Sequence, residues 1–167
     1  MALTQNCILN HQEINHKIKR IAYQIYESNV EQKEIVLAGI QSNGYILAEK
    51  IKQQLEEISE IKAKLCSVKI NKKNPKEKII TSLSTEEYSN TSLVLVDDVL
   101  HSGTTLIYGV KHFLDTSLTQ FKTAVLVNRN HKKYPVKADF KGISLSTSLN
   151  EHIDVIFDGE HSKVVLV

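Results

Sequence analysis

Features that define several protein classes are missing from this sequence of 167 residues. There is no stretch of about 20 apolar residues, the length that a membrane-spanning helix requires. The segment from Met1 to Asn6 lacks the basic start and apolar run of a secretion signal, so we expect a cytoplasmic protein without a membrane partner. The two cysteines, Cys7 and Cys66, have neither metal-ligand spacing nor the density of a disulfide-rich scaffold, and we expect reduced thiols.

An excess of charge of one sign is also missing. The 21 basic and 19 acidic residues give a formal net charge of +2 with neutral histidines. Proteins that bind nucleic acid through their overall charge are strongly basic, so any anion site in this chain must be local. The hydrophobic fraction of 41% and the charged fraction of 24% are ordinary for a globular protein, and the length fits one compact domain.

Hydrophobic spacing predicts alternating strands and helices. Asn10 followed by Glu13 is typical of a capping box, and isoleucines spaced by three and four residues predict a helix to about Asn29. Short, nearly continuous apolar runs are typical of strands that are covered on both faces of a parallel sheet. The predicted strands are 34–40, 63–70, 93–96, 123–127 and three short candidates near 138–143, 153–157 and 163–167.

Two further helices are predicted, one by the apolar stripe from Leu47 to Ile58 and one by the spacing from Leu106 to Phe113. Strands that alternate with crossover helices imply an α/β fold, a doubly wound and mostly parallel sheet with helices on both faces. Its site should lie at the carboxyl ends of the strands. The segment 71–90 is polar, rich in lysine and broken by Pro75, so we expect an exposed flexible flap without core residues.

The segment 93–105 carries the clearest chemical signal. Asp97 and Asp98 leave a buried strand shortly before a loop of small residues that opens a helix. The free N–H groups of such a loop, its hydroxyls and the positive end of the helix together form a phosphate cradle, in which glycine allows close backbone approach. The adjacent acids are placed to accept hydrogen bonds from neighbouring sugar hydroxyls. The loop residues are Ser102, Gly103, Thr104 and Thr105.

Two other interpretations of this segment are simpler. Asp97 and Asp98 could merely end a strand while Ser102 caps a helix, which is common for either element alone. The acid pair could also bind Mg²⁺ directly, but that leaves the hydroxyl-rich loop without a function. The Walker pattern G-x-x-x-x-G-K-[ST] is absent. The combination of acids and loop therefore favours a ribose phosphate as the ligand.

The segment 93–105 resembles the motif with which type I phosphoribosyltransferases bind 5-phosphoribosyl-1-pyrophosphate (PRPP). The resemblance implies that Asp97 and Asp98 bind the ribose 2′ and 3′ hydroxyls and that residues 102–105 hold the 5′-phosphate. It also implies that His101 lies with the acids at the catalytic centre and that Mg²⁺ arrives with the pyrophosphate rather than on protein ligands. The family fold adds a small hood, which we expect in the strands at about 136–167 of a single domain.

A narrower resemblance, to the PyrR-type uracil phosphoribosyltransferases, covers nearly the whole chain. Segments 8–29, 38–44, 124–131, 135–140 and 146–151 are similar, in the same order, to the first helix, the pyrophosphate loop and the uracil-side segments of that family. The resemblance implies transfer of phosphoribosyl from PRPP to N1 of uracil, giving UMP and pyrophosphate. We also expect a homodimer or higher homo-oligomer.

This resemblance assigns two further groups of residues. The pyrophosphate loop is Gln41, Ser42, Asn43 and Gly44. The base-binding residues are Asn128, Arg129, His131 and Lys137. PyrR-type loops usually carry Lys and Arg, whereas this loop is neutral, so pyrophosphate binding should weaken unless Lys72 or Lys73 compensates. The alternative for these two lysines is a solvated loop.

Alternatives remain for the base and for regulation. A neutral His101 could accept a proton from the base, pack on it or face water. Lys137 resembles the lysine with which purine phosphoribosyltransferases bind an exocyclic oxygen, which keeps hypoxanthine and guanine as alternative substrates. PyrR-type proteins also bind a messenger RNA stem-loop. Here Lys19 and Arg20 persist but Tyr23 stands where a histidine is expected, so RNA binding is the less favoured reading.

Overall fold

The computed structural model describes residues 6–148 and 150–167, and it contains one large and one small β-sheet. The larger sheet consists of β2 (Glu34–Ile40), β3 (Lys62–Lys69), β4 (Ile80–Thr81), β5 (Ser92–Leu100), β6 (Gln120–Arg129) and β7 (Phe140–Leu145). The smaller sheet consists of β1 (Asn6–Leu9), β8 (Ile153–Ile156) and β9 (Lys163–Leu166). The helices are α1 (His11–Glu27), α2 (Asn43–Ile58), α3 (Thr85–Tyr88), α4 (Thr104–Leu114) and the short 3-10 helix η1 (Gly159–His161).

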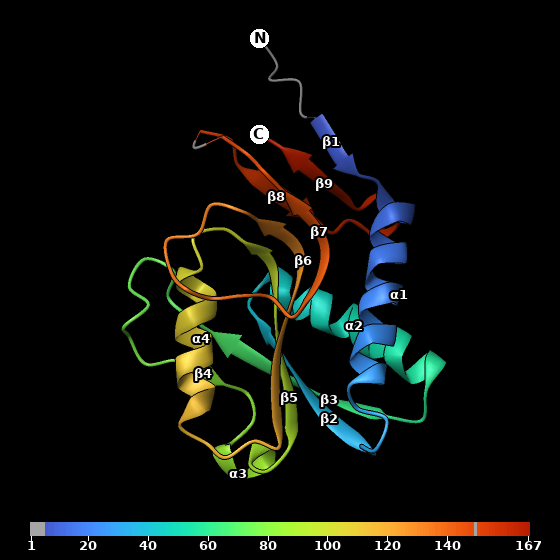
Figure 1. Ribbon diagram of the computed structural model, residues 1–167, viewed down its shortest axis with the longest axis vertical. Helices are drawn as coiled ribbons and strands as arrows, with labels where there is room; N and C mark the ends of the chain where they lie inside the picture. The colour runs from blue at the N-terminus through green and yellow to red at the C-terminus, as the bar shows by residue number, and fades with distance from the viewer. Residues whose placement is uncertain (1–5, 149) are drawn as a thin grey trace.

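The larger sheet has the strand order β4-β3-β2-β5-β6-β7 (Figure 1). The strands from β3 to β7 along this order run parallel, and β4 pairs antiparallel with β3. Every residue of β2 after Glu34 is buried, and so is every residue of β5 except Asp98. Strands buried on both faces require cover on both sides. The predicted doubly wound, mostly parallel α/β sheet is therefore confirmed.

Helices cover the two faces of the larger sheet unequally. α1 and α2 lie together on one face and α4 on the other, as Figure 1 shows. α1 begins with the predicted capping box, because Glu13 N donates to Asn10 Oδ1 at 2.9 Å and Asn10 N donates to Glu13 Oε1 at 3.2 Å. Its isoleucines at 14, 18, 21 and 25 are fully buried against the sheet. Among the described residues, no helix has the length and apolarity needed to cross a membrane.

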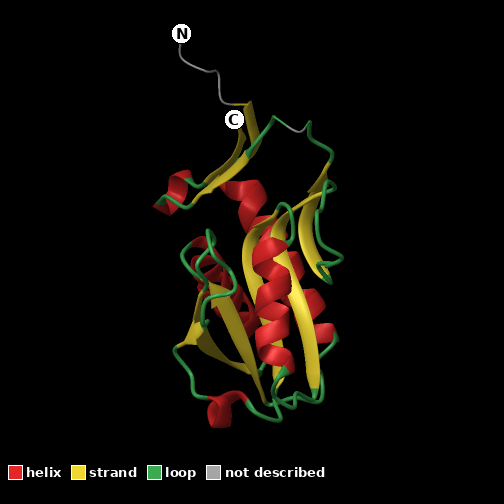
Figure 2. Ribbon diagram, turned by 90° about the vertical axis from the view of Figure 1, so that its left-hand side faces the viewer, coloured by secondary structure: helices red, strands yellow, loops and turns green. Residues whose placement is uncertain are grey.

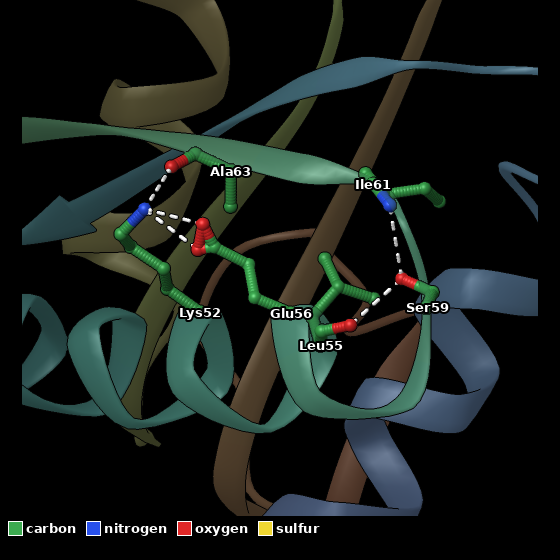
Figure 3. A network of polar contacts seen from close by, with 6 residues as sticks. All are labelled: Lys52, Leu55, Glu56, Ser59, Ile61 and Ala63. Atoms are coloured by element: carbon green, nitrogen blue, oxygen red, sulfur yellow. Dashed lines mark hydrogen bonds and ion pairs between the residues drawn. The ribbon is translucent and has the colours of Figure 1, made fainter.

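A small polar network fixes the end of α2 to the start of β3 (Figure 3). Lys52 Nζ lies 2.9 Å from both carboxylate oxygens of Glu56 and donates to the backbone oxygen of Ala63 at 2.7 Å. The hydroxyl of Ser59 donates to a carbonyl of the last helical turn at 2.7 Å. The network ties the helix to the strand that follows it.

The second half of the segment 71–90 differs from the expected exposed flap. It contains β4 and α3, and Tyr88 is only 3% exposed because its ring packs edge-on against Phe113, with centroids 5.2 Å apart. Ile79 and Leu83 pack against the same core cluster. The prediction that this segment has no core residues is therefore wrong for its second half. The three apolar side chains were hard to recognise as core residues because they are dispersed among many polar ones. Residues 71–74 are exposed as expected.

The hood is also composed differently from the expectation for residues 136–167. β7 belongs to the larger sheet, where it pairs parallel with β6. β8 and β9 form the smaller sheet together with β1, whose Asn6 pairs with Leu166. Figure 2 shows this small sheet at one end of the molecule, beyond the strands of the larger sheet. β1 was not predicted, because four residues that pair with the far end of the chain carry no local signal.

Candidate active site

A cleft of about 580 Å³ lies where the carboxyl end of β5 faces the smaller sheet. Its walls come from β5, from the loop before α4 and from β8, with Asn43 and Lys72 at its border. Because β2 and β5 are parallel neighbours, the loops that leave them open on the same edge of the sheet. The site therefore lies where the parallel fold predicts it.

The two acids of β5 have different environments. Asp97 is 4% exposed, and its Oδ1 accepts a hydrogen bond from the backbone N–H of Asp98 at 2.9 Å. Burial raises the pKa of Asp97 well above its usual range, the charge of Asp98 adds to this, and the charge of Lys72 opposes it. Asp98 is partly exposed and lines the cleft. Both acids line the cleft, and Asp98 is the more exposed of the two.

The loop after β5 has the conformation of an anion cradle. Gly103 precedes α4 with φ of +87°, a left-handed conformation that favours glycine. The hydroxyls of Ser102 and Thr104 lie 2.8 Å apart, and the backbone N–H of Thr104 donates to Ser102 Oγ. The backbone N–H groups of Lys133 and Tyr134 both donate to the carbonyl oxygen of Ser102. These two backbone hydrogen bonds hold the loop in place, while residues 102–105 line the cleft.

Two histidine rings stack across the cleft. The rings of His101 and His152 are nearly parallel, 6° apart, with centroids 4.7 Å from each other. Nδ1 of His101 is buried and has no hydrogen-bond partner among the described residues. Burial lowers the pKa of His101, and the nearby charges of His152 and Arg129 lower it further, while Asp98 opposes them. His101 is thus held as a neutral imidazole with one unpaired ring nitrogen.

The structure brings some of the predicted site residues together at the cleft and places others outside it. The residues at the cleft are Asn43, Asp97, Asp98, His101, Ser102, Gly103, Thr104 and Thr105. Gln41 and Ser42 are exposed in the loop before α2, and buried Gly44 lies behind the acids. Lys72, which was considered as a substitute cation for the neutral loop, lines the cleft.

The predicted base-binding residues lie at the end of β6 and beyond it. Asn128 donates to Ser144 Oγ at 3.2 Å, so its amide is used within the sheet. A guanidinium nitrogen of Arg129 donates to the backbone oxygen of Ser148 at 2.6 Å. His131 and Lys137 are exposed and do not line the cleft. Their assignment to base binding stays a prediction.

Sequence reasoning missed the contribution of β8. His152, Ile153, Asp154 and Val155 all line the cleft, and His152 Nε2 lies 3.3 Å from Asp154 Oδ1. The four residues of β8 alternate between buried and partly exposed, which is typical of a strand. Nothing in their sequence shows which other part of the chain the strand will pack against. A histidine next to a predicted strand of the hood was the only available signal.

This fold and this cleft define a phosphoribosyltransferase-type protein, because a parallel sheet delivers paired acids and a phosphate loop to one edge. The family model for the Phosphoribosyl transferase domain matches residues 4–160, and the chain belongs to that family as a PyrR-like type I member. It is 35% identical to the Bifunctional protein PyrR of Fusobacterium nucleatum, over 99% of this chain and 100% of that protein. It is 34% identical to the Bifunctional protein PyrR of Streptococcus thermophilus, over 87% of each chain.

Solved structures agree on the fold. The hypoxanthine phosphoribosyltransferase of Trypanosoma cruzi matches with a TM-score of 0.80 over 96% of this chain and 95% of that chain, at 15% identity. A hypoxanthine-guanine phosphoribosyltransferase of Bacillus anthracis matches with a TM-score of 0.73 over 84% of this chain and 82% of that chain, at 17% identity. The predicted type I phosphoribosyltransferase fold is therefore confirmed.

Gly44→Ala tests how closely α2 must approach the acids. A Cβ at this position would lie 2.7 Å from the backbone oxygen of Val96 and 3.0 Å from Cα of Asp97. Because backbone atoms cannot move aside, we expect the free energy of unfolding in urea to fall by about 1–3 kcal/mol. Glu49→Ala, an exposed change on the same helix, should leave it unchanged. Equal stability of Gly44→Ala and the parent would contradict the close packing.

The lowered pKa of His101 predicts how stability depends on pH. Below the ordinary histidine pKa of about 6.5 the unfolded chain takes up a proton that folded His101 resists, so the contribution of His101 to the free energy of unfolding should fall as the pH is lowered from 7 to 5, while the raised pKa of buried Asp97 contributes in the opposite direction. His101→Asn should reduce this fall, and His112, whose pKa burial also lowers, should supply part of the remainder. His161→Asn, an exposed control, should keep the parental slope in urea titrations at each pH. An unchanged slope in His101→Asn would refute the assignment.

Proposed function

We propose that the protein transfers the phosphoribosyl group of PRPP to N1 of uracil, giving UMP and pyrophosphate. The observation that carries the proposal is one cleft in which Asp97 and Asp98, near the carboxyl end of buried β5, lie beside the glycine-containing loop and the start of α4 that follow the strand. The identity of the base rests on the resemblance to the PyrR-type uracil phosphoribosyltransferases. It is supported by relatives of 35% and 34% identity that are called Bifunctional protein PyrR.

The ribose and the 5′-phosphate of PRPP fit the two halves of the cleft. Asp98 is the accessible acid and accepts a ribose hydroxyl, while buried Asp97 accepts the N–H of Asp98 and orients it. The 5′-phosphate accepts hydrogen bonds from the hydroxyls of residues 102–105 and from the free N–H groups that begin α4. As positive charge develops on the ribose during transfer, the carboxylates stabilise it without forming a covalent bond.

The pyrophosphate needs a cation that the neutral loop at 41–44 does not supply. Lys72 lines the cleft and is close enough for its charge to act on the pKa values of Asp97 and His101. We assign to its ammonium group a charge-assisted hydrogen bond to the pyrophosphate. Such bonds are about twice as strong as neutral ones, so one lysine offsets part of the missing charge of the loop.

The donor atoms of the site fit Mg²⁺ that arrives with PRPP. Carboxylate and hydroxyl oxygens are the ligands that this ion prefers, and it commonly binds through few protein groups together with substrate phosphates. Within residues 6–148 and 150–167 no three His, Cys, Asp or Glu side chains are grouped so that they could hold a metal by themselves. When bound, the ion would neutralise charge on the departing pyrophosphate. Asp98 is the protein group that could contact it.

The base lies beside the stacked histidines. His101 directly precedes the phosphate loop, so a base joined to the ribose on Asp98 lies near its ring. His101 lines the cleft, and we assign to its imidazole the role of accepting a ring N–H of the incoming base. Because its pKa is lowered, the neutral imidazole accepts the proton that N1 of uracil loses.

Asp97→Asn tests the ribose assignment. The buried carboxylate has a raised pKa and therefore destabilises the folded state at pH 7, so its replacement by a neutral amide should increase the free energy of unfolding. Because a neutral amide oxygen accepts the N–H of Asp98 more weakly than a carboxylate does, Asp98 should be held less firmly and PRPP binding should weaken roughly tenfold in calorimetry. Asp115→Asn, an exposed change after α4, should alter neither quantity. Parental PRPP affinity in Asp97→Asn would refute the proposed role of Asp97 in orienting Asp98 for the ribose.

Thermal protection by nucleotides tests the choice of base. At a hundredfold excess over its dissociation constant, UMP should stabilise the fold by about 2.7 kcal/mol. IMP and GMP at the same concentrations should stabilise it less, because exposed Lys137 does not line the cleft in which a purine would need it. Stronger protection by IMP or GMP would replace uracil with a purine while leaving the phosphoribosyltransferase assignment in place.

A further inference from the structure

Asn43 joins three parts of the molecule through one side-chain amide. It is the first residue of α2, directly after the loop that leaves β2. Its Nδ2 donates to Asp98 Oδ2 at 3.1 Å and to the backbone oxygen of Val155 at 2.8 Å. An amide nitrogen carries two hydrogens, so both donors are used. One side chain therefore bridges the acid at the end of β5 and the strand β8 of the smaller sheet.

The bond to Val155 is a specific polar attachment between the two sheets. β8 otherwise meets the larger sheet through apolar packing, in which Val155 is 6% exposed and Ile153 is 1% exposed. Apolar contacts hold the small sheet near the cleft, but they are not directional. In the described part of the chain, the Asn43 amide provides the one side-chain hydrogen bond from the edge of the larger sheet to β8. It sets where β8 lies over the cleft.

The bond to Asp98 fixes the carboxylate on the other side. Asp98 Oδ1 accepts the backbone N–H of Val99 at 2.8 Å, and Oδ2 accepts the amide of Asn43. Both carboxylate oxygens therefore have a donor before any ligand is bound, and the plane of the group is determined. A carboxylate oxygen has about two lone-pair sites, so each oxygen can accept a further bond from a ribose hydroxyl. The acid is preorganised rather than blocked.

We propose that Asn43 is a positioning residue that couples the seating of β8 to the orientation of Asp98, and so links the base side of the cleft to its ribose side. The inference deepens and rests on the proposed function. It differs from the family expectation for this loop, in which the residue would serve the pyrophosphate. Both amide hydrogens of Asn43 point instead to Asp98 and Val155. The positioning role of Asn43 therefore depends on two directional hydrogen bonds that its amide donates at the same time.

UMP distinguishes a role of Asn43 in positioning Asp98 and β8 from a role in pyrophosphate binding, because UMP contains ribose, phosphate and base but no pyrophosphate. Asn43→Ala loses both bonds, and we expect its calorimetric affinity for UMP to fall about tenfold. Asn43→Asp keeps the shape but places a carboxylate against Asp98 and a carbonyl oxygen, so its affinity should fall further, by about a hundredfold. Gln53→Ala removes an exposed amide from the same helix and should bind UMP like the parent. Parental or higher UMP affinity in Asn43→Ala, with weaker binding of pyrophosphate, would overturn the proposal.

Hydrogen exchange without any ligand tests the attachment of β8 independently. In Asn43→Ala the amides of β8 and β9 should exchange faster than in the parent, whereas those of β2 and β5 should not change. Equal exchange of β8 in the two proteins would refute the role of Asn43 as an attachment. If the parent bound neither UMP nor PRPP, the proposed function would fail, and the exchange experiment would still decide whether Asn43 seats β8.

Discussion

The site depends on a pair of adjacent carboxylates placed at the end of a strand that is buried on both faces. β5 is the centre of the larger sheet, and every residue in it except Asp98 is buried. Both acids line the cleft, but Asp97 is buried while Asp98 is partly exposed. Burial disfavours the charged form of Asp97 and raises its pKa. Its carboxylate accepts the backbone N–H of Asp98 and so helps to fix the position of that residue.

The groups around the two acids donate hydrogen bonds to them or place a positive charge nearby. The backbone N–H of Asp98 satisfies Asp97, and the amide of Asn43 satisfies Asp98. Lys72 brings a positive charge from the segment after β3, which opposes the rise in the pKa of Asp97. The loop at 41–44 is neutral, but Lys72 gives the cleft a positive charge. In the proposed function this lysine supplies charge that PyrR-type sequences usually carry in the loop.

The smaller sheet completes the cleft from the other side. It contains β8, which contributes His152 and Val155, and it is assembled from the two ends of the described chain by the pairing of β1 with β9. Stacking of His152 on His101 and the bond from Asn43 to Val155 connect this sheet to the loops of the larger one. Contacts between distant segments therefore connect the two sides of the cleft.

Much of this architecture could be predicted because it is encoded locally. The capping box at Asn10, the buried strand 34–40 and the strand-loop-helix order of segment 93–105 each carry their own pattern, and the structure has all three. The predicted strand 93–96 was too short, because β5 continues through both acids to Leu100. The burial of Tyr88 was not predicted. Its segment contains only a four-residue helix, which is too short to show a hydrophobic periodicity. The short strand β1 was missed for a related reason, because its partner lies at the opposite end of the chain.

The sequence by itself determined the chemistry, because adjacent acids and a hydroxyl-rich loop at a helix start are neighbours along the chain. The tertiary structure alone decided which acid is buried, that His101 stacks on His152, and that Asn43 serves Asp98 and Val155. These facts arise from residues that are far apart in sequence and meet only when the two sheets pack. Hydrogen bonds and ring stacking depend on distances of a few ångströms, which local patterns do not specify.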